Sequence, residues 1–187
     1  MERCGWCGQE KIYVSYHDYE WGVPERNSRA LWEKLILDGF QAGLSWLTIL
    51  KKRDAFRLAF DGFDPDKVAQ YGPDKVTRLL GNAGIVRHRG KIEAAITNAR
   101  AWQQIEAREG FDQFLWRYVD GVPLQTKRRC DQDIPAKTPL SAQISRDLGA
   151  EGFKFCGPTI VYAFMQAVGM VNDHLLSCPR HAEVQRL

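Results

Sequence analysis

The sequence lacks any uninterrupted apolar stretch long enough to cross a bilayer. The longest nearly apolar run, residues 159–171, is interrupted by Gln166 and falls short of the roughly 18 residues that a spanning helix requires. No apolar segment follows the first residues, Met1-Glu-Arg-Cys4, so we expect no secretory leader. These absences argue against a membrane partner and favour a cytoplasmic location.

Internal repeats, low-complexity tracts and Gly/Ser-rich linkers are also missing, and no stretch alternates apolar and polar residues as a strand does. Fibrous and disordered classes are therefore excluded, since 44% hydrophobic and 26% charged residues are ordinary for a globular protein. A chain of 187 residues is long enough for one well-buried core and short for two. We expect one compact all-α domain over residues 1–187.

Apolar residues recur at helical spacing through most of the chain. Ser28 is a plausible N-cap for one helix, and Pro65 and Pro73 stand where the first helical position of two others would be. Further helices are expected over 87–102, 111–119, 141–148 and 158–169, the last buried on nearly every face. We expect irregular structure in the aromatic N-terminal segment and an ordered loop over 120–138.

The cysteine count is odd, because the chain has five. This argues against a disulfide framework and for reduced thiols. Cys4, Cys7 and His17 lie near one end of the chain, whereas His174 and Cys178 lie near the other. Thiolates and imidazoles are the usual ligands of structural zinc. His174 and Cys178 could form half of such a site, and the other half could be Cys4 with His17 or Cys4 with Cys7. Cys4 and Cys7 also have the spacing of a redox dithiol, although the βαβ context is missing.

Positive charge is clustered rather than abundant. The net charge is only +3, but residues 51–53, 87–91 and 127–129 form three basic clusters. The second cluster follows a glycine-containing turn and opens a helix, an arrangement that binds phosphate through backbone N–H groups and cationic side chains. Solvated helix ends produce the same pattern. The predicted DNA-binding residues here are Gly84, Arg87, Arg89 and Lys91.

The first 21 residues are rich in aromatic side chains, and Trp46 follows later. Such side chains dominate cores, but they also stack on flat ligands such as an extruded base. Asp38 projects about 20° from Leu31 on a helix and so lies at the margin of the apolar stripe. It is either a surface carboxylate paired with Lys34 or a carboxylate that faces a pocket and accepts a hydrogen bond from a base.

Several long motifs together resemble the bacterial 3-methyladenine DNA glycosylase I family, from Met1 to about Cys178. They are Cys4-Gly-Trp, Tyr16-His17-Asp18-x-Glu20-Trp21-Gly22-Val23-Pro24, Gln41-Ala42-Gly43-Leu44-Ser45-Trp46, Ala83-Gly84-Ile85-Val86-Arg87-His88-Arg89-Gly90-Lys91-Ile92, Gly152-Phe153-Lys154-Phe155 and Val171-Asn172-Asp173-His174. This resemblance implies a helix-hairpin-helix DNA glycosylase with its hairpin motif at about 74–102. The implied reaction is hydrolysis of the N-glycosidic bond of N3-methyladenine in alkylated double-stranded DNA by a monofunctional, base-flipping enzyme, with free 3-methyladenine as the product.

The resemblance also implies particular site residues. One structural zinc would join residues 4–17 to 174–178 and leave Cys7 as a spare thiol. Gly43 and Leu44 would form a turn that inserts into DNA. The implied zinc ligands are Cys4, His17, His174 and Cys178.

The implied base pocket departs from the family at one position. The best-known members carry Glu where this chain has Asp38, which is one methylene shorter. We expect Tyr16, Asp38 and Trp46 to be the catalytic residues, with Trp6, Tyr13 and Trp21 also binding the base. Two alternatives to a monomeric glycosylase are a non-catalytic, zinc-stapled DNA-binding protein and a thiol-redox protein.

Overall fold

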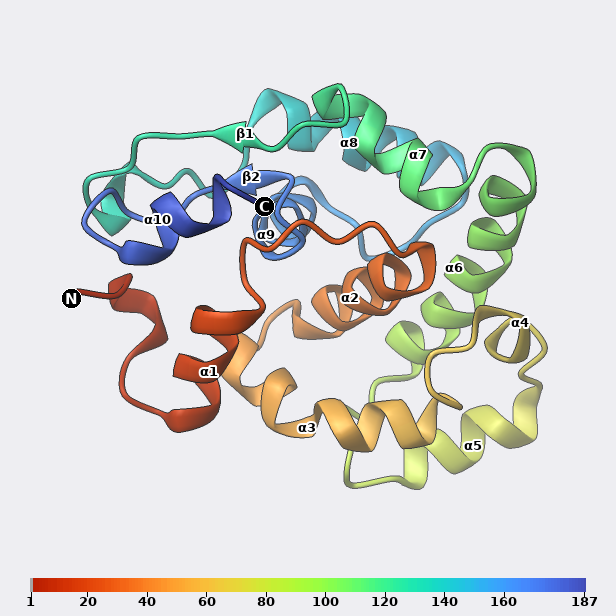
Figure 1. Cartoon of the computed structure of the whole chain (residues 1–187). Helices are drawn as coiled ribbons and strands as arrows, with labels where there is room; N and C mark the ends of the chain where they lie inside the picture. The colour runs from red at the N-terminus through yellow and green to blue at the C-terminus, as the bar shows by residue number, and fades with distance from the viewer. Residues whose placement is uncertain (1) are drawn as a thin grey trace.

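The computed structural model describes residues 2–187, and helices make up most of this range (Figure 1). The ten α-helices are α1 (Lys11–Tyr19), α2 (Ser28–Gln41), α3 (Trp46–Ala59), α4 (Pro65–Val68), α5 (Pro73–Gly81), α6 (Arg89–Arg108), α7 (Phe111–Trp116), α8 (Pro139–Ala150), α9 (Pro158–Ala167) and α10 (Pro179–Val184). Short 3₁₀ turns lie at Gly5–Cys7, Arg117–Val119 and Asp131–Asp133. The expectation of a mostly helical fold is confirmed.

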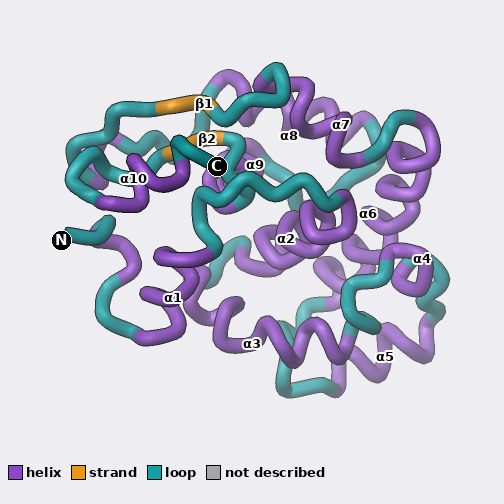
Figure 2. The backbone as a smooth tube through the Cα atoms, in the orientation of Figure 1, coloured by secondary structure: helices purple, strands orange, loops and turns teal. Residues whose placement is uncertain are grey.

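The all-α prediction is wrong in one detail, since two short strands are present. Strand β1 (Leu124–Gln125) pairs in parallel with β2 (Val171–Asn172), with Leu124 opposite Val171 and Gln125 opposite Asn172 (Figure 2). Strand β1 lies in the segment that we expected to be a loop. Each strand has two residues, which is too short to produce a readable alternation of apolar and polar side chains.

Helix starts follow the sequence signals with small shifts. Pro65 and Pro73 are the first residues of α4 and α5, as predicted. The N-cap of α2 is Asn27 rather than Ser28, and its side chain accepts two backbone N–H hydrogen bonds of 3.0 Å. Helix α6 begins two residues later than predicted, because the His88 side chain caps it.

Both chain ends contain a helix that we did not predict. The N-terminal segment contains α1, and the last nine residues contain α10, on which His181 and Val184 are buried. These helices have nine and six residues, and helices this short depend on tertiary packing rather than on propensity. Cys4, Leu175 and Cys178 form a small buried cluster, so the two ends of the chain pack against each other.

The core is built around α2, which packs against α3, α6, α7 and α9. Leu31, Trp32 and Phe40 of α2 are almost completely buried. Helix α9 is central, as expected, and Val161 and Phe164 are fully buried. Within residues 2–187, no helix is both long and apolar enough to span a membrane.

Candidate active site

A cavity of about 420 Å³ opens between the N-terminal segment, α2, the start of α3 and α9. It is bounded on one side by the segment 131–136, from the loop region before α8. All six residues that we expected to bind a base line this one cavity: Trp6, Tyr13, Tyr16, Trp21, Asp38 and Trp46. The fold therefore brings together residues that are up to 40 positions apart in the sequence.

The cavity walls are aromatic and flat. Trp6 packs edge-on against Tyr13 and Trp21, with ring centroids 5.0 and 4.9 Å apart. On the other side, the Tyr16 ring is tilted at 47° to Trp46 with centroids 5.4 Å apart. The indole N–H groups of Trp6 and Trp46 are buried without a hydrogen-bond partner in the part of the chain that the structure describes. Such walls suit a planar ligand with polar edges.

Asp38 lies near the C-terminal end of α2 and is only 2% exposed. Its Oδ1 atom is ion-paired with Lys34, one helical turn earlier, whereas its Oδ2 atom has no hydrogen-bond partner among residues 2–187. Burial raises the pKa of Asp38, and Lys34 opposes that rise. The predicted pairing with Lys34 thus exists, but the carboxylate lines the pocket and is not on the surface.

Tyr16, on α1, stays a neutral phenol over a wide pH range. Burial, reinforced by the carboxylates of Asp38 and Glu20, raises the pKa of its hydroxyl well above the usual value. A phenol of this kind can donate or accept a hydrogen bond but is a poor general base near neutral pH.

Lys34 is a pocket residue that the sequence did not predict. Its Nζ atom lies 3.9 Å from the centroid of the Trp46 ring and also contacts Asp38. The four-residue spacing between Lys34 and Asp38 predicted their pairing. It did not predict that the Lys34 ammonium group would lie over the Trp46 ring. Gln41, Gln166 and the segment 131–136 also line the cavity and were missed. The segment 131–136 lies in an irregular loop, where no periodic pattern can mark a pocket residue. Gln41 and Gln166 lie on α2 and α9, and nothing in the sequence separates them from other polar helix residues.

The turn between α2 and α3 is next to the cavity and carries Gly43 and Leu44. Gly43 has a φ of +81°, in the left-handed region that favours glycine, and Leu44 is 41% exposed. The turn is held by the Leu44 N–H, which donates to the Gln41 carbonyl at 2.7 Å. An exposed leucine on a rigid turn beside a base-sized cavity can enter a DNA duplex as an apolar wedge.

Residues 82–88 connect α5 to α6 and present part of the predicted basic cluster. Arg87 and Arg89 are exposed, and Arg89 forms an ion pair of 3.3 Å with Glu93. The Gly84 carbonyl accepts a hydrogen bond of 3.3 Å from Lys52, which holds the connection against α3.

Lys91 is buried and does not face phosphate as we predicted. We expected it to face phosphate, but it is only 8% exposed, and its ammonium group points into the protein. It donates hydrogen bonds of 2.8 and 2.6 Å to the carbonyl oxygens of Phe40 and Ala42, at the C-terminal end of α2. These carbonyls have no partner within the helix, so Lys91 supports the turn that carries Leu44.

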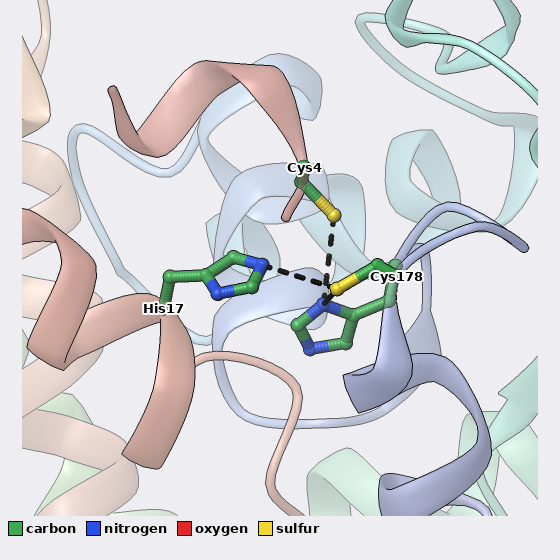
Figure 3. Close-up of side chains that lie close together, drawn as sticks. Cys4, His17 and Cys178 are labelled. Atoms are coloured by element: carbon green, nitrogen blue, oxygen red, sulfur yellow. Dashed lines mark hydrogen bonds between the residues drawn. The ribbon is translucent and has the colours of Figure 1, made fainter. Parts of the chain in front are cut away.

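A second cluster joins the two ends of the chain. Cys4, His17, His174 and Cys178 are all buried, and each offers one donor atom, with all four atoms within 4.8 Å of one another. Figure 3 shows Cys4, His17 on α1 and Cys178 at the start of α10 pointing toward one another. This set could hold a metal ion. Cys7 lies outside it, and its thiol donates to the Cys4 carbonyl at 3.2 Å.

The histidines of this cluster are oriented by oxygen acceptors. His17 Nδ1 lies 2.8 Å from the Asp18 carboxylate, and His174 Nε2 lies 3.0 Å from the Trp21 carbonyl. Because these oxygens can only accept, the facing ring nitrogens carry the protons. The lone pairs of His17 Nε2 and His174 Nδ1 are thereby left for the interior of the cluster. Hydrogen bonding from Cys4, with help from both imidazoles, lowers the pKa of the Cys178 thiol.

The site combines an aromatic pocket and a buried carboxylate with an exposed leucine turn and a basic connection between two helices. This combination is typical of a helical DNA glycosylase. The comparisons with known proteins agree. Residues 6–181 match the family model described as methyladenine glycosylase. The chain is 51% identical to DNA-3-methyladenine glycosylase 1 of Escherichia coli (strain K12) over 95% of its own length and 96% of that protein.

Solved structures agree as well. A crystal structure of a 3-methyladenine DNA glycosylase I is 51% identical, with a TM-score of 0.94, covering 95% of this chain and 98% of that one. Another, determined in complex with 3-methyladenine, is 40% identical, with a TM-score of 0.93 and coverage of 96% and 97%. The chain belongs to the methyladenine glycosylase family. This membership confirms the expected glycosylase function over the non-catalytic and redox alternatives.

Proposed function

We propose that this enzyme flips N3-methyladenine out of alkylated double-stranded DNA into the aromatic cavity and hydrolyses its N-glycosidic bond. The observation that carries the proposal is the buried Asp38 carboxylate, which keeps one oxygen unpaired in a cavity walled by Trp46 and Tyr16. An acceptor in that position can take a hydrogen bond from an amino group on a purine edge.

The reaction needs little catalytic machinery, because methylation at N3 makes the adenine cationic and weakens the bond to the sugar. The leaving group therefore needs no proton. Trp46 contributes stacking and cation–π attraction of roughly 0.5–2 kcal/mol. Asp38 contributes negative charge and a hydrogen-bond acceptor, and Tyr16 contributes a neutral hydroxyl. These are the three proposed catalytic residues.

The proposed activity is monofunctional hydrolysis without strand cleavage. A glycosylase that also cleaves the strand uses an uncharged lysine to attack the sugar. Lys34 is the one lysine that lines the cavity within residues 2–187. Burial lowers the pKa of Lys34, and the pairing with Asp38 opposes that fall. The protonated amine of this ion pair is not a nucleophile.

DNA binding is proposed for two neighbouring surfaces, in the manner of a helix-hairpin-helix protein. The turn at Gly43 and Leu44 would enter the duplex where the base leaves. The connection at Gly84, with Arg87 and Arg89, would hold the phosphate backbone through the start of α6. All of these residues belong to one chain, so we expect a monomer to be active, with the cytoplasm as its location because its substrate is genomic DNA.

The Cys4, His17, His174 and Cys178 cluster is proposed to hold one structural zinc ion. Bond lengths of about 2.3 Å to sulfur and 2.0–2.1 Å to nitrogen place tetrahedral S and N ligands about 3.6 Å apart. Three sulfur–nitrogen separations in the cluster are 3.6, 3.6 and 3.8 Å. With four protein ligands, such an ion has no position for substrate and would stabilise the fold only.

The test is base release from methylated DNA. The enzyme should release 3-methyladenine from alkylated duplex DNA and leave abasic sites that break only after alkali treatment. Binding to the DNA without base release would instead support a non-catalytic DNA-binding protein. Strand breaks without alkali would contradict the monofunctional mechanism.

A further inference from the structure

The Lys34 side chain lies in the cavity proposed to receive the base, between Asp38 and Trp46. Its ammonium group pairs with Asp38 and lies 3.9 Å above the centre of the Trp46 ring. Carbon atoms in contact are about 3.5–4.0 Å apart, so the plane of a base stacked on this face of Trp46 would pass through the position of this ammonium group. In the structure, the enzyme's own cation therefore contacts Trp46 and one oxygen of Asp38, two of the three residues to which the proposed function assigns recognition.

We propose that Lys34 is a built-in competitor of the substrate: the cationic 3-methyladenine nucleotide displaces its ammonium group, and that group returns to expel the base after cleavage. This inference rests on the proposed function. It gives Lys34, one helical turn before Asp38, a role in substrate selection and in product release.

The charge balance of the reaction explains the return of Lys34. When the bond between the sugar C1′ and the base N9 breaks, its electron pair moves to the purine and cancels the positive charge. Water adds its hydroxyl to C1′, and the remaining proton goes to solvent. A neutral product then faces a buried carboxylate, which is unfavourable without a cation. Lys34 can restore that compensation.

The same balance explains the selection of the damaged base. An undamaged adenine is neutral, so it cannot replace the ammonium group beside Asp38. Displacement of Lys34 by a normal base would leave Asp38 as an uncompensated buried charge, whereas the methylated base brings its own positive charge. The competitor therefore rejects ordinary bases more strongly than it rejects the lesion.

A second position for the displaced side chain is available next to the pocket. Lys34 and Trp46 also line an adjoining cavity of about 270 Å³. Its wall carries Glu20 and Glu33, which pair with Arg53 and Arg57 of the same wall, and Glu25. Within residues 2–187, the Glu25 carboxylate is bonded only to two backbone N–H groups. The Lys34 side chain is 16% exposed, and a rotation of its stem would carry the ammonium group toward Glu25 without moving α2.

The experiment compares Lys34→Met, which keeps the unbranched stem and loses the charge, with Lys34→Arg, which keeps the charge. Free 3-methyladenine should inhibit Lys34→Met at concentrations lower by about tenfold or more, the value of one charged hydrogen bond. Its steady-state rate should fall by more than its single-turnover rate, because product release becomes limiting. Lys34→Arg should resemble the unaltered enzyme. Equal product inhibition in all three proteins would overturn the proposal.

A second measurement uses the unaltered protein. Its structure with bound 3-methyladenine should show Lys34 Nζ withdrawn from Asp38 toward the adjoining cavity, and a Lys34–Asp38 pair that persists beside the base would contradict the proposal. Absence of base release from alkylated DNA would refute the proposed function instead. Binding of the free base to the two variants would still test Lys34 in that case.

Discussion

The ammonium group of Lys91, in the first turn of α6, donates a hydrogen bond of 2.6 Å to the carbonyl oxygen of Ala42, at the end of α2. The two residues are 49 positions apart, and their hydrogen bond joins the two surfaces proposed to bind DNA. The buried ammonium group of Lys91 therefore links the basic connection before α6 to the turn at Leu44.

Replacement of Lys91 by Met should destabilise the protein and loosen the Leu44 turn. A hydrogen bond from a charged donor contributes about 1.5–3 kcal/mol, and Lys91 donates two. We therefore expect the free energy of unfolding, measured by urea denaturation, to fall by at least about 1.5–3 kcal/mol. Arg89→Met is the matched control, since Arg89 is exposed on the same helical turn and should change stability by less than about 0.5 kcal/mol. Equal stability of the two variants would show that Lys91 does not support the turn.

The exposed arginines should control the salt dependence of DNA binding. The double variant Arg87→Ala/Arg89→Ala should weaken binding to all sequences alike and reduce the slope of log K against log salt by about two, one for each phosphate group that is no longer neutralised. Lys91→Met should leave that slope unchanged, because its ammonium group faces inward. A slope that the double variant does not alter would place the phosphate-binding residues elsewhere.

Asp38→Asn should weaken binding of free 3-methyladenine by about 1.5–3 kcal/mol, because the hydrogen bond would no longer have a charged acceptor. Trp46→Ala should also weaken it, because the base would no longer stack on an indole. Calorimetry measures both effects, and Asp38→Glu, which retains the charge, should keep activity. If Asp38→Asn binds the base and cleaves DNA like the unaltered enzyme, the carboxylate serves only as the partner of Lys34.

Excision should fall in acid at a higher pH than an ordinary aspartate would produce. Burial raises the pKa of Asp38, and only its ionised form attracts the cationic base, so activity is present above that pKa and is lost as pH falls through it. Lys34 opposes the rise, so Lys34→Met should move the acid limb to still higher pH. Tyr16 stays neutral throughout, and Arg53 and Glu20 pair with each other nearby. Single-turnover rates between about pH 4 and 8 test this, and an unmoved acid limb in Lys34→Met would argue against it.

The cluster at the chain ends should contain one equivalent of zinc by metal analysis. Cys7→Ser should retain the metal, whereas Cys4→Ser and His174→Ala should lose it, since binding energy at such a site is also folding energy. Chelation should lower the thermal stability of the unaltered protein. Loss of zinc from Cys7→Ser to the same extent would mean that the ligand set is wrong.

The parts of the fold that the sequence predicted are those with local signals. Proline at the first position marked α4 and α5, and the apolar pattern of α9 marked a buried helix. Strands of two residues carry no period, and α1 and α10 are too short for propensity to specify them. Their positions depend on packing against distant segments, which no local pattern describes.

The site was predicted unevenly for the same reason. The resemblance to the glycosylase family implied Tyr16, Asp38 and Trp46 as pocket residues, since the residue types alone left core packing and a surface ion pair open, and the fold places them around one cavity. The role of Lys91 was predicted wrongly, because a basic residue after a glycine turn looks the same in sequence whether its ammonium group faces solvent or the carbonyl of Ala42. The position of Lys34 over Trp46 depends on how α2 meets α3, and helix spacing alone cannot give it.

His17 connects the metal-binding cluster to the base pocket through a shared helix. Tyr13 and Tyr16 stand on α1 with it, and His174 is bonded to the carbonyl of the pocket residue Trp21. A zinc ion held by this cluster, as proposed, would therefore fix the position of α1 and of Trp21, two parts of the wall of the base pocket, without touching the base itself.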